Sequence, residues 1–246
     1  MDAVPTELNL DDMALFLDVD GTLLDIAPRP SDVVVPENLP QVLAAAERRV
    51  GGALALLSGR PIDDLDRLFF PLKLRASGAH GAEIRYAPDS LCETLAPGEL
   101  PPRTWRDVQR MIAEFHGTFA ENKGTSIAVH HRLMRRPVDD LAEGLRRIVA
   151  GLAPLDVELV QGRRVFEIKR SGFDKGAALR RFMATEPFRG RKPIFVADEE
   201  IDRAGFEAAI ALGGHALCVG QEILPGLLGG FLHPSAVRDW LAGLAA

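Results

Sequence analysis

The chain has 246 residues, 47% of them hydrophobic and 26% charged, so it is long enough for one or two globular domains with their own cores. Its formal net charge of −6 argues against general nucleic-acid binding but allows a small anionic substrate. Two cysteines without metal-type spacing, an N-terminus without a signal-peptide pattern and the lack of a membrane-length apolar run favour a cytoplasmic protein with no membrane partner. No feature points to a particular oligomeric state.

The first predicted elements alternate between strands and helices. Residues 13–17 and 53–57 are short apolar runs closed by acidic or Ser-Gly residues, which is typical of strands buried on both faces of a parallel sheet. Residues 36–50 carry apolar side chains at helical spacing. Pro61 followed by two aspartates predicts the start of another helix.

The middle of the chain has a different order, in which a helix followed by two strands occurs twice. The predicted elements are helix 105–115, strands 118–121 and 125–131, helix 138–149, and strands 155–160 and 164–169. Asn-Lys-Gly and Gln-Gly sequences between the paired strands suit hairpin turns. This order predicts a small antiparallel sheet with two helices on one face, entered through the proline-rich stretch 97–102.

The last part of the chain returns to alternation. Its predicted elements are helix 174–183, strand 194–197, helix 199–210 and strand 216–219. The sequence therefore predicts an α/β protein with a Rossmann-like, doubly wound parallel sheet and an inserted α+β cap domain. We expect the core in residues 1–90 and 169–246, and the cap in residues 91–168.

Polar residues close three of the predicted parallel strands. Asp18 and Asp20 follow the first strand, Ser58 the second and Asp198 a later one. Ligands of open parallel sheets bind beyond the carboxyl ends of the strands, so these side chains are expected at one edge. Two carboxylates at a buried strand end suit Mg²⁺, which prefers hard oxygen ligands. An Asx-type turn and the metal site of a glycosyltransferase are the alternatives for this pair.

Further polar groups extend this candidate site. The Ser58 hydroxyl, the amides around Gly59 and the Arg60 guanidinium suit a phosphate, although a serine-capped turn explains the same pattern. Lys175 lies at the start of a predicted helix. If its side chain faces the site, it can neutralise a phosphate or a carboxylate; the alternative is a solvated surface lysine. His80 lies in a glycine-bounded loop, for which a simple turn is the alternative.

Acidic residues cluster after the strand at 194–197. They are either charges at a helix N-terminus or part of a metal site. We assign Asp198 to the metal and leave Glu199 and Asp202 open between the two readings.

The motifs Asp-x-Asp-Gly-Thr, Ser-Gly-Arg and Asp-Lys-Gly, followed by the acidic cluster, resemble the haloacid dehalogenase (HAD) superfamily of phosphatases. The inserted unit resembles the type C2 cap of that superfamily. Four stretches are similar to trehalose-6-phosphate phosphatases: 18–24 (DVDGTLL), 78–85 (GAHGAEIR), 121–132 (ENKGTSIAVHHR) and 165–176 (VFEIKRSGFDKG).

The resemblance implies a phosphatase that depends on Mg²⁺ and hydrolyses a small phosphosugar, trehalose 6-phosphate, to trehalose and phosphate. Asp18 would attack phosphorus and form an aspartyl-phosphate, while Asp20 would protonate the leaving oxygen and then activate water. Ser58 and Lys175 would hold the phosphoryl oxygens, and Mg²⁺ would be bound by Asp18, the backbone carbonyl of Asp20 and Asp198. The implied substrate-binding residues are Gly59, Arg60, His80, Lys123, His130, Arg132 and Glu167, of which the last four would contact the sugar.

One motif departs from the family pattern, which usually reads Gly-Asp-Asp-x-Thr-Asp-Glu. The changed positions are Ala197, Glu199, Ile201 and Arg203. Because Asp198 and Asp202 remain, we still expect a metal site. We expect it to bind Mg²⁺ more weakly than the full motif does, since Glu199 is longer than the usual aspartate and Arg203 replaces an acid with a base. The alternative functions are another C2-capped sugar phosphatase, acting on sucrose-phosphate or a glycosyl-phosphoglycerate, and a weakly active or non-catalytic sugar-phosphate-binding homologue.

Overall fold

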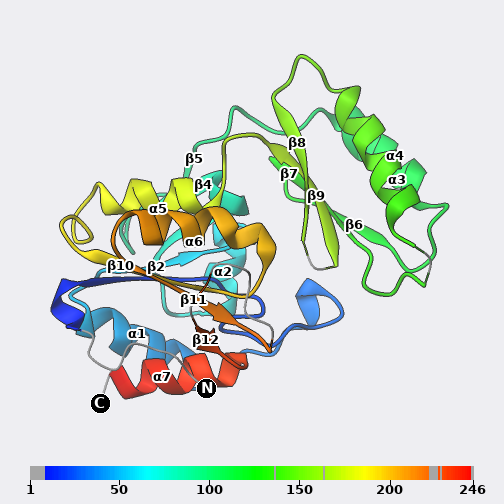
Figure 1. Cartoon of the computed structure of the whole chain (residues 1–246). Helices are drawn as coiled ribbons and strands as arrows, with labels where there is room; N and C mark the ends of the chain where they lie inside the picture. The colour runs from blue at the N-terminus through cyan, green and yellow to red at the C-terminus, as the bar shows by residue number, and fades with distance from the viewer. Residues whose placement is uncertain (1–8, 136, 163, 222–226, 228, 245–246) are drawn as a thin grey trace. The chain divides into compact units, whose positions relative to one another are not determined.

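The computed structural model describes residues 9–135, 137–162, 164–221, 227 and 229–244 (Figure 1). The chain divides into two compact units, one formed by Met1–Glu93 with Asp174–Ala246 and the other by Thr94–Phe173. Within the described ranges, no helix has the length and apolar character needed to cross a membrane.

The first unit is built on a sheet whose described strands have the order β12-β11-β10-β1-β2-β3-β4-β5. These strands are β1 (Met13–Leu17), β2 (Leu54–Leu57), β3 (Arg75–Gly78), β4 (Glu83–Arg85), β5 (Glu93–Thr94), β10 (Lys192–Ala197), β11 (His215–Val219) and β12 (Gly230–Phe231). The strands from β12 to β3 are parallel, and β4 is antiparallel to β3. Every residue of β1 and β2 is buried, as expected for strands covered on both faces.

Helices cover both faces of this sheet (Figure 1). Helices α1 (Leu39–Arg49) and α7 (Pro234–Leu244) pack together on one face, and α5 (Lys175–Met183) and α6 (Arg203–Ala211) on the other. Helix α2 (Ile62–Leu68) follows β2, and the short 3₁₀ turns are η1 (Leu10–Asp12), η2 (Pro30–Asp32), η3 (Ala79–Gly81) and η4 (Glu200–Asp202). The prediction of a doubly wound parallel sheet is confirmed.

The second unit is an antiparallel sheet with the strand order β6-β7-β9-β8 and two helices on one face (Figure 1). Its elements are α3 (Pro102–Ile112), β6 (Phe119–Asn122), β7 (Ser126–His130), α4 (Asp139–Ala150), β8 (Val157–Gln161) and β9 (Val165–Arg170). They follow the predicted order of a helix and two strands, repeated once.

The two faces of this antiparallel sheet differ in character. The helix-facing side is apolar and includes Ile127, Val129, Phe166 and Ile168. On the other face Glu121, Ala128 and Glu167 lie side by side in the register of β6, β7 and β9. Because successive residues of a strand point to opposite faces, polar side chains collect on the face that the helices leave uncovered.

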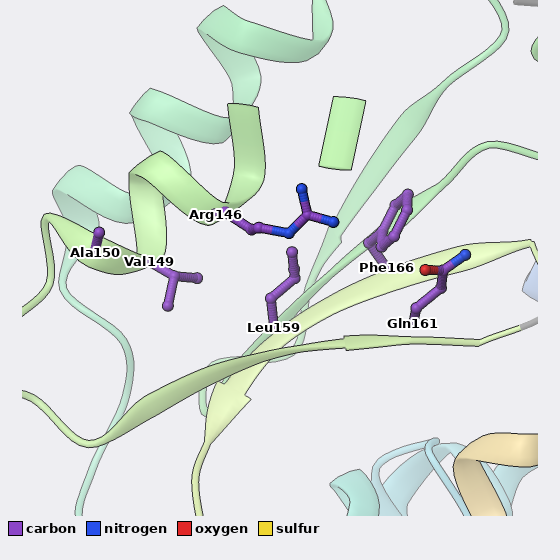
Figure 2. Close-up of a pocket in the computed structure, with 6 residues that line it drawn as sticks. All are labelled: Arg146, Val149, Ala150, Leu159, Gln161 and Phe166. Atoms are coloured by element: carbon purple, nitrogen blue, oxygen red, sulfur yellow. The ribbon is translucent and has the colours of Figure 1, made fainter. Parts of the chain in front are cut away.

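A hollow with a volume of about 360 Å³ opens on the helix-facing side (Figure 2). It is lined by Arg146, Val149 and Ala150 of α4 and by Leu159, Gln161 and Phe166 of the sheet. Phe166 and Glu167 are consecutive in β9, so they point to opposite faces. The hollow is therefore separate from the sheet face that carries the predicted sugar-binding residues.

Candidate active site

The candidate site forms where β1, β2 and β10 end. The register pairs Leu17 of β1 with Val196 of β10 and with Leu56 of β2. The backbone N–H of Asp18 extends this ladder by donating to the Val196 carbonyl at 2.9 Å. Parallel pairing therefore collects the polar residues that follow the three strands at one edge of the sheet.

Asp18 is buried and held by two side chains. Lys175 Nζ donates to Asp18 Oδ1 at 2.5 Å, and the Thr22 hydroxyl donates to Asp18 Oδ2 at 3.1 Å. Asp18 is 4% exposed and Lys175 5% exposed. Lys175 is the first residue of α5, and Asp174 caps this helix by accepting from the Ala177 N–H. The start of α5 thus aims Lys175 at the first strand, and the solvated alternative for this lysine is excluded.

Burial and the neighbouring charges shift the pKa values of this pair. Burial raises the pKa of Asp18 to about 6, although Lys175 opposes the shift. Burial lowers the pKa of Lys175, but the Asp18 and Asp202 carboxylates outweigh it and hold that pKa above its usual range. The lysine therefore stays charged at neutral pH and supports the ionised, nucleophilic form of Asp18.

Three carboxylates gather beside this pair. Asp18, Asp198 and Asp202 each place an oxygen within 4.8 Å of the others. Burial, followed by the charges of Asp18, Glu199 and Asp202, raises the pKa of Asp198 to about 9. This concentration of acidic oxygens in a buried setting is the donor set that a hard metal ion requires.

Asp202 supplies a second sign that the cluster needs a cation. It is 1% exposed, and Lys175 Nζ lies 2.6 Å from its Oδ1. The ammonium of Lys175 therefore lies against Oδ1, while Oδ2 has no hydrogen-bond partner among the described residues. Lys175 also pairs with Asp18, so its single charge offsets only part of the negative charge of the three carboxylates, which is costly to bury without a further cation. Asp202, for which the sequence leaves a metal site and a helix-start charge open, lies within the carboxylate cluster.

Gly21 makes room for the cluster. Its φ of +82° lies in the left-handed region, and a Cβ on it would strike the Asp198 carboxylate. The substitutions in the acidic motif that follows β10 leave the cluster intact. Arg203, which stands where the family has an acid, directs its guanidinium to exposed Glu200, with Nη2 2.8 Å from Oε2. Glu199 is half-buried and adds negative charge beside Asp198.

The Ser58–Arg60 turn contacts the second aspartate of the Asp-x-Asp motif. Arg60 Nε and Nη2 donate to the two carboxylate oxygens of Asp20 at 2.6 and 2.7 Å. The buried Ser58 hydroxyl accepts from the Arg60 backbone N–H at 3.1 Å. The sequence assigns Arg60 to substrate binding, and in the structure its guanidinium contacts Asp20.

His80 packs on the same turn. A Cβ at Gly59 would collide with the His80 imidazole, so the ring lies directly over this glycine. His80 and Ala79 both have positive φ, 53° and 46°, which is unusual for residues with side chains. Left-handed backbone at two successive positions costs conformational energy and persists where the surroundings fix it, as at functional sites.

The predicted sugar-binding residues lie in the second unit. Glu167 of β9 is 2% exposed and accepts a hydrogen bond from the Ser126 hydroxyl at 2.6 Å. Lys123, in the β6–β7 turn, places Nζ 3.4 Å from the same Glu167 oxygen. A buried carboxylate that holds a lysine and a serine forms a defined polar centre on this sheet face.

A second polar pair lies on the same face. His130 Nε2 is 3.3 Å from Glu121 Oε2, and its ring stacks on Phe119 with centroids 4.4 Å apart. The hydrogen bond from His130 lowers the pKa of Glu121 despite its burial. His131 instead stacks on Phe166 of the apolar side, as strand alternation predicts, and half-buried Arg132 follows in the turn.

The sequence reasoning did not assign Thr22, Ser126 or Glu121 to a site. Thr22 belongs to the Asp-Val-Asp-Gly-Thr motif, which is the signal that identifies it. Ser126 and Glu121 could have been found from alternation, since they share the sheet face of Glu167.

Comparison with known proteins places this arrangement in a family. The trehalose-phosphatase family model matches residues 16–212. The chain is 35% identical to "Probable trehalose-phosphate phosphatase" of Sinorhizobium fredii, over 96% of this chain and 89% of the relative. It is 37% identical to trehalose-6-phosphate phosphatase of Escherichia coli, over 84% of this chain and 77% of the relative.

Solved structures support the fold. The C-terminal domain of trehalose-6-phosphate phosphatase from C. albicans superimposes with a TM-score of 0.80 at 17% identity, covering 96% of this chain and 92% of that one. A haloacid dehalogenase-like hydrolase from B. subtilis gives a TM-score of 0.66 at 16% identity, covering 94% and 98%. The family model and the two relatives show that the chain belongs to the trehalose-phosphatase family.

Proposed function

We propose that this protein is a trehalose-6-phosphate phosphatase, which hydrolyses trehalose 6-phosphate to trehalose and inorganic phosphate. The observation that carries the proposal is the buried Asp18–Lys175 pair beside the carboxylate cluster, in a chain that matches the trehalose-phosphatase family. The substrate is inferred from the relatives named above, and the mechanism of phosphoryl transfer is inferred from the geometry of the site.

We propose that the metal is Mg²⁺, held by the carboxylates of Asp18 and Asp198 and by the backbone carbonyl of Asp20. The gathering of three carboxylates around the single charge of Lys175 and the raised pKa of Asp198 support a further cation here. Oxygen ligands without sulfur or imidazole favour a hard ion such as Mg²⁺. When bound, Mg²⁺ offsets the negative charge of phosphate and carboxylates.

Asp18 acts as the nucleophile in this proposal. One of its carboxylate oxygens bonds to phosphorus, the bond from phosphorus to the sugar oxygen breaks, and Asp20 gives a proton to that oxygen. Asp20 then takes a proton from water, which attacks phosphorus, releases inorganic phosphate and restores Asp18. Lys175 and Ser58 hold phosphoryl oxygens during both steps, and Lys175 and Thr22 keep Asp18 in place.

We propose that the second unit is a C2-type cap that recognises the sugar. The core residues treat every phosphate monoester alike, so selectivity requires groups that read sugar hydroxyls. Lys123, Glu167 and His130 are such groups on the polar face of the cap sheet, and we assign Arg132 to the same task. The contact of Ser126 with Glu167 and that of Glu121 with His130 hold these two side chains in defined orientations before substrate binds.

The test is a phosphate-release assay with trehalose 6-phosphate, sucrose 6-phosphate and a glycosyl-phosphoglycerate, each with and without Mg²⁺. We expect Mg²⁺-dependent turnover with the highest kcat/KM on trehalose 6-phosphate. A higher value on either of the others would assign the chain to another C2-capped sugar phosphatase. Tight binding of trehalose 6-phosphate without turnover of any ester would identify a non-catalytic binding protein.

A further inference from the structure

The Arg60 side chain contacts two other segments of the core unit, at Asp20 and at Pro30. Its guanidinium holds both oxygens of the Asp20 carboxylate, and Nη2 also donates to the Pro30 carbonyl at 2.9 Å. The backbone N–H of Arg60 is bound to Ser58 Oγ. The side chain is 11% exposed. Arg60 is therefore fixed at its backbone, by the strand-end serine, and at its head, by Pro30 of the 3₁₀ turn η2.

This arrangement fixes the orientation of Asp20. A side chain of aspartate rotates about two bonds, and a planar two-point contact with a guanidinium removes most of that freedom. An ionised carboxylate offers about four lone-pair positions, so two remain available after Arg60 has bound. Asp20 keeps 38% of its side-chain surface exposed, which leaves those positions accessible. The same carboxylate can be held in place and still exchange a proton with a leaving group or a water.

We infer that Arg60 is a positioning residue, which acts through Asp20 and orients its carboxylate for proton transfer. The inference rests on the proposed function in one respect, namely that Asp20 is the acid and base of the reaction. Three segments meet at this point, because Asp20 follows β1, Arg60 follows β2 and Pro30 begins η2. The hydrogen bonds described above for Asp18 come from Lys175 and Thr22, so removal of the guanidinium takes away the contacts with Asp20 and Pro30 and none of those.

Leaving-group chemistry separates this role from phosphate binding. A good leaving group such as 4-nitrophenolate departs without a proton, whereas a phenolate or sugar alkoxide needs one. Loss of Asp20 orientation therefore slows esters with poor leaving groups and spares 4-nitrophenyl phosphate. Loss of a phosphate-binding group slows all esters alike, because the phosphoryl group is the same in each.

The experiment measures kcat/KM for a series of aryl phosphates from 4-nitrophenyl to phenyl phosphate, and for trehalose 6-phosphate, in saturating Mg²⁺. Arg60→Met should lose about 10- to 100-fold on phenyl phosphate and trehalose 6-phosphate, a fraction of a full acid–base contribution. It should lose less than about threefold on 4-nitrophenyl phosphate. Arg60→Lys should behave similarly, because an ammonium cannot bind both carboxylate oxygens in one plane. The control is Arg67→Met, since Arg67 of α2 is 74% exposed and forms an ion pair with Asp64, one helical turn away.

A double mutant tests whether Arg60 acts through Asp20. If it does, Arg60→Met costs nothing further in an Asp20→Asn background, whereas independent roles give additive losses. Equal losses on all aryl phosphates, or additive losses in the double mutant, would overturn the inference. If Arg60→Met fails to fold, as judged by circular dichroism and thermal melting, Arg60→Lys carries the same comparison.

The outcomes also separate this inference from the proposed function. The aryl series contains no sugar, so it remains readable if trehalose 6-phosphate is not the substrate. If Asp20→Asn itself leaves the leaving-group dependence unchanged, the acid–base assignment of Asp20 fails, and the inference fails with it. If Asp20→Asn steepens the dependence and Arg60→Met does not, only the role of Arg60 is refuted.

Discussion

Asp198→Asn should stabilise the metal-free protein while removing its response to Mg²⁺. Burial and the charges of Asp18, Glu199 and Asp202 oppose ionisation of Asp198 and raise its pKa from 3.8 to about 9. In the metal-free protein the folded state therefore keeps a proton that the unfolded chain releases. Because the pKa of Asp198 is raised in the folded state, the contribution of Asp198 to the free energy of unfolding is most favourable below pH 3.8. This contribution falls as pH rises toward 9. Asparagine does not titrate, so at this position its contribution to the free energy of unfolding does not change with pH.

The magnitude follows from the pKa shift. Each pKa unit corresponds to about 1.4 kcal/mol, so a shift of about five units sets an upper limit of about 7 kcal/mol on the stability that Asp198→Asn gains above pH 9. Asp198 is half-buried, and solvent screening reduces this limit to about 1–3 kcal/mol at pH 8. For a chain of this length each kcal/mol shifts the melting temperature by about 2–4 °C, so Asp198→Asn should melt on the order of 5 °C higher.

The assay is thermal melting of both proteins from pH 4 to pH 8, in EDTA and in excess Mg²⁺. The difference in melting temperature should be near zero at pH 4 and should grow as pH rises. Mg²⁺ should raise the melting temperature of wild type, since it binds the folded state, and have little effect on the mutant. Asp89→Asn, at an exposed acid outside the cluster, is the matched control and should follow wild type. A pH-independent difference, or an equal Mg²⁺ response in both proteins, would refute the reasoning.

Three further predictions concern turnover. Asp18→Asn should fold normally and release no phosphate in a single-turnover experiment, because the amide cannot attack phosphorus; release at the wild-type rate would contradict its role as nucleophile. Glu199→Asp restores the family residue beside the cluster and should lower the Mg²⁺ concentration for half-maximal activity in a titration; an unchanged or higher value would count against our reading of the changed motif. Glu167→Ala should cut kcat/KM for trehalose 6-phosphate by about a hundredfold or more, as loss of a buried charged hydrogen bond does, while sparing 4-nitrophenyl phosphate. Equal losses on both substrates would show that Glu167 supports the fold rather than the sugar.

The sequence predicted the elements that carry a strong apolar pattern and missed those that do not. The predicted strand at 13–17 coincides with β1, and the cap follows the expected order. Strand β3 (Arg75–Gly78) has no apolar run, so only its pairing with β2 defines it. The predicted helix at 199–210 begins later, at Arg203, because η4 first turns Asp202 inward toward Lys175. Long-range contacts of this kind override local propensity.

The candidate site was predictable in its residue types but not in all of its contacts. Position at strand ends was enough to indicate Asp18, Asp20, Ser58 and Asp198. Spacing could not show that Arg60 turns to Asp20, because the choice between a phosphate and a carboxylate depends on where the loops fold. For the same reason the two readings of Asp202 could be separated only by its burial and its distance from Lys175.

The placement of Asp18 and Lys175 explains how an inserted domain can vary without loss of the chemistry. The two residues are 157 positions apart, in the two core segments that flank the insertion, and a hydrogen bond of 2.5 Å joins them. Asp202 adds a further contact from the second segment. Thr22 and Lys175, the side chains that hold Asp18, both belong to the core unit, so none of its hydrogen bonds given above depends on a cap residue. If the polar face of the cap sheet recognises the sugar, as proposed, substitutions on it should change which sugar is accepted while leaving Asp18, Thr22 and Lys175 in place.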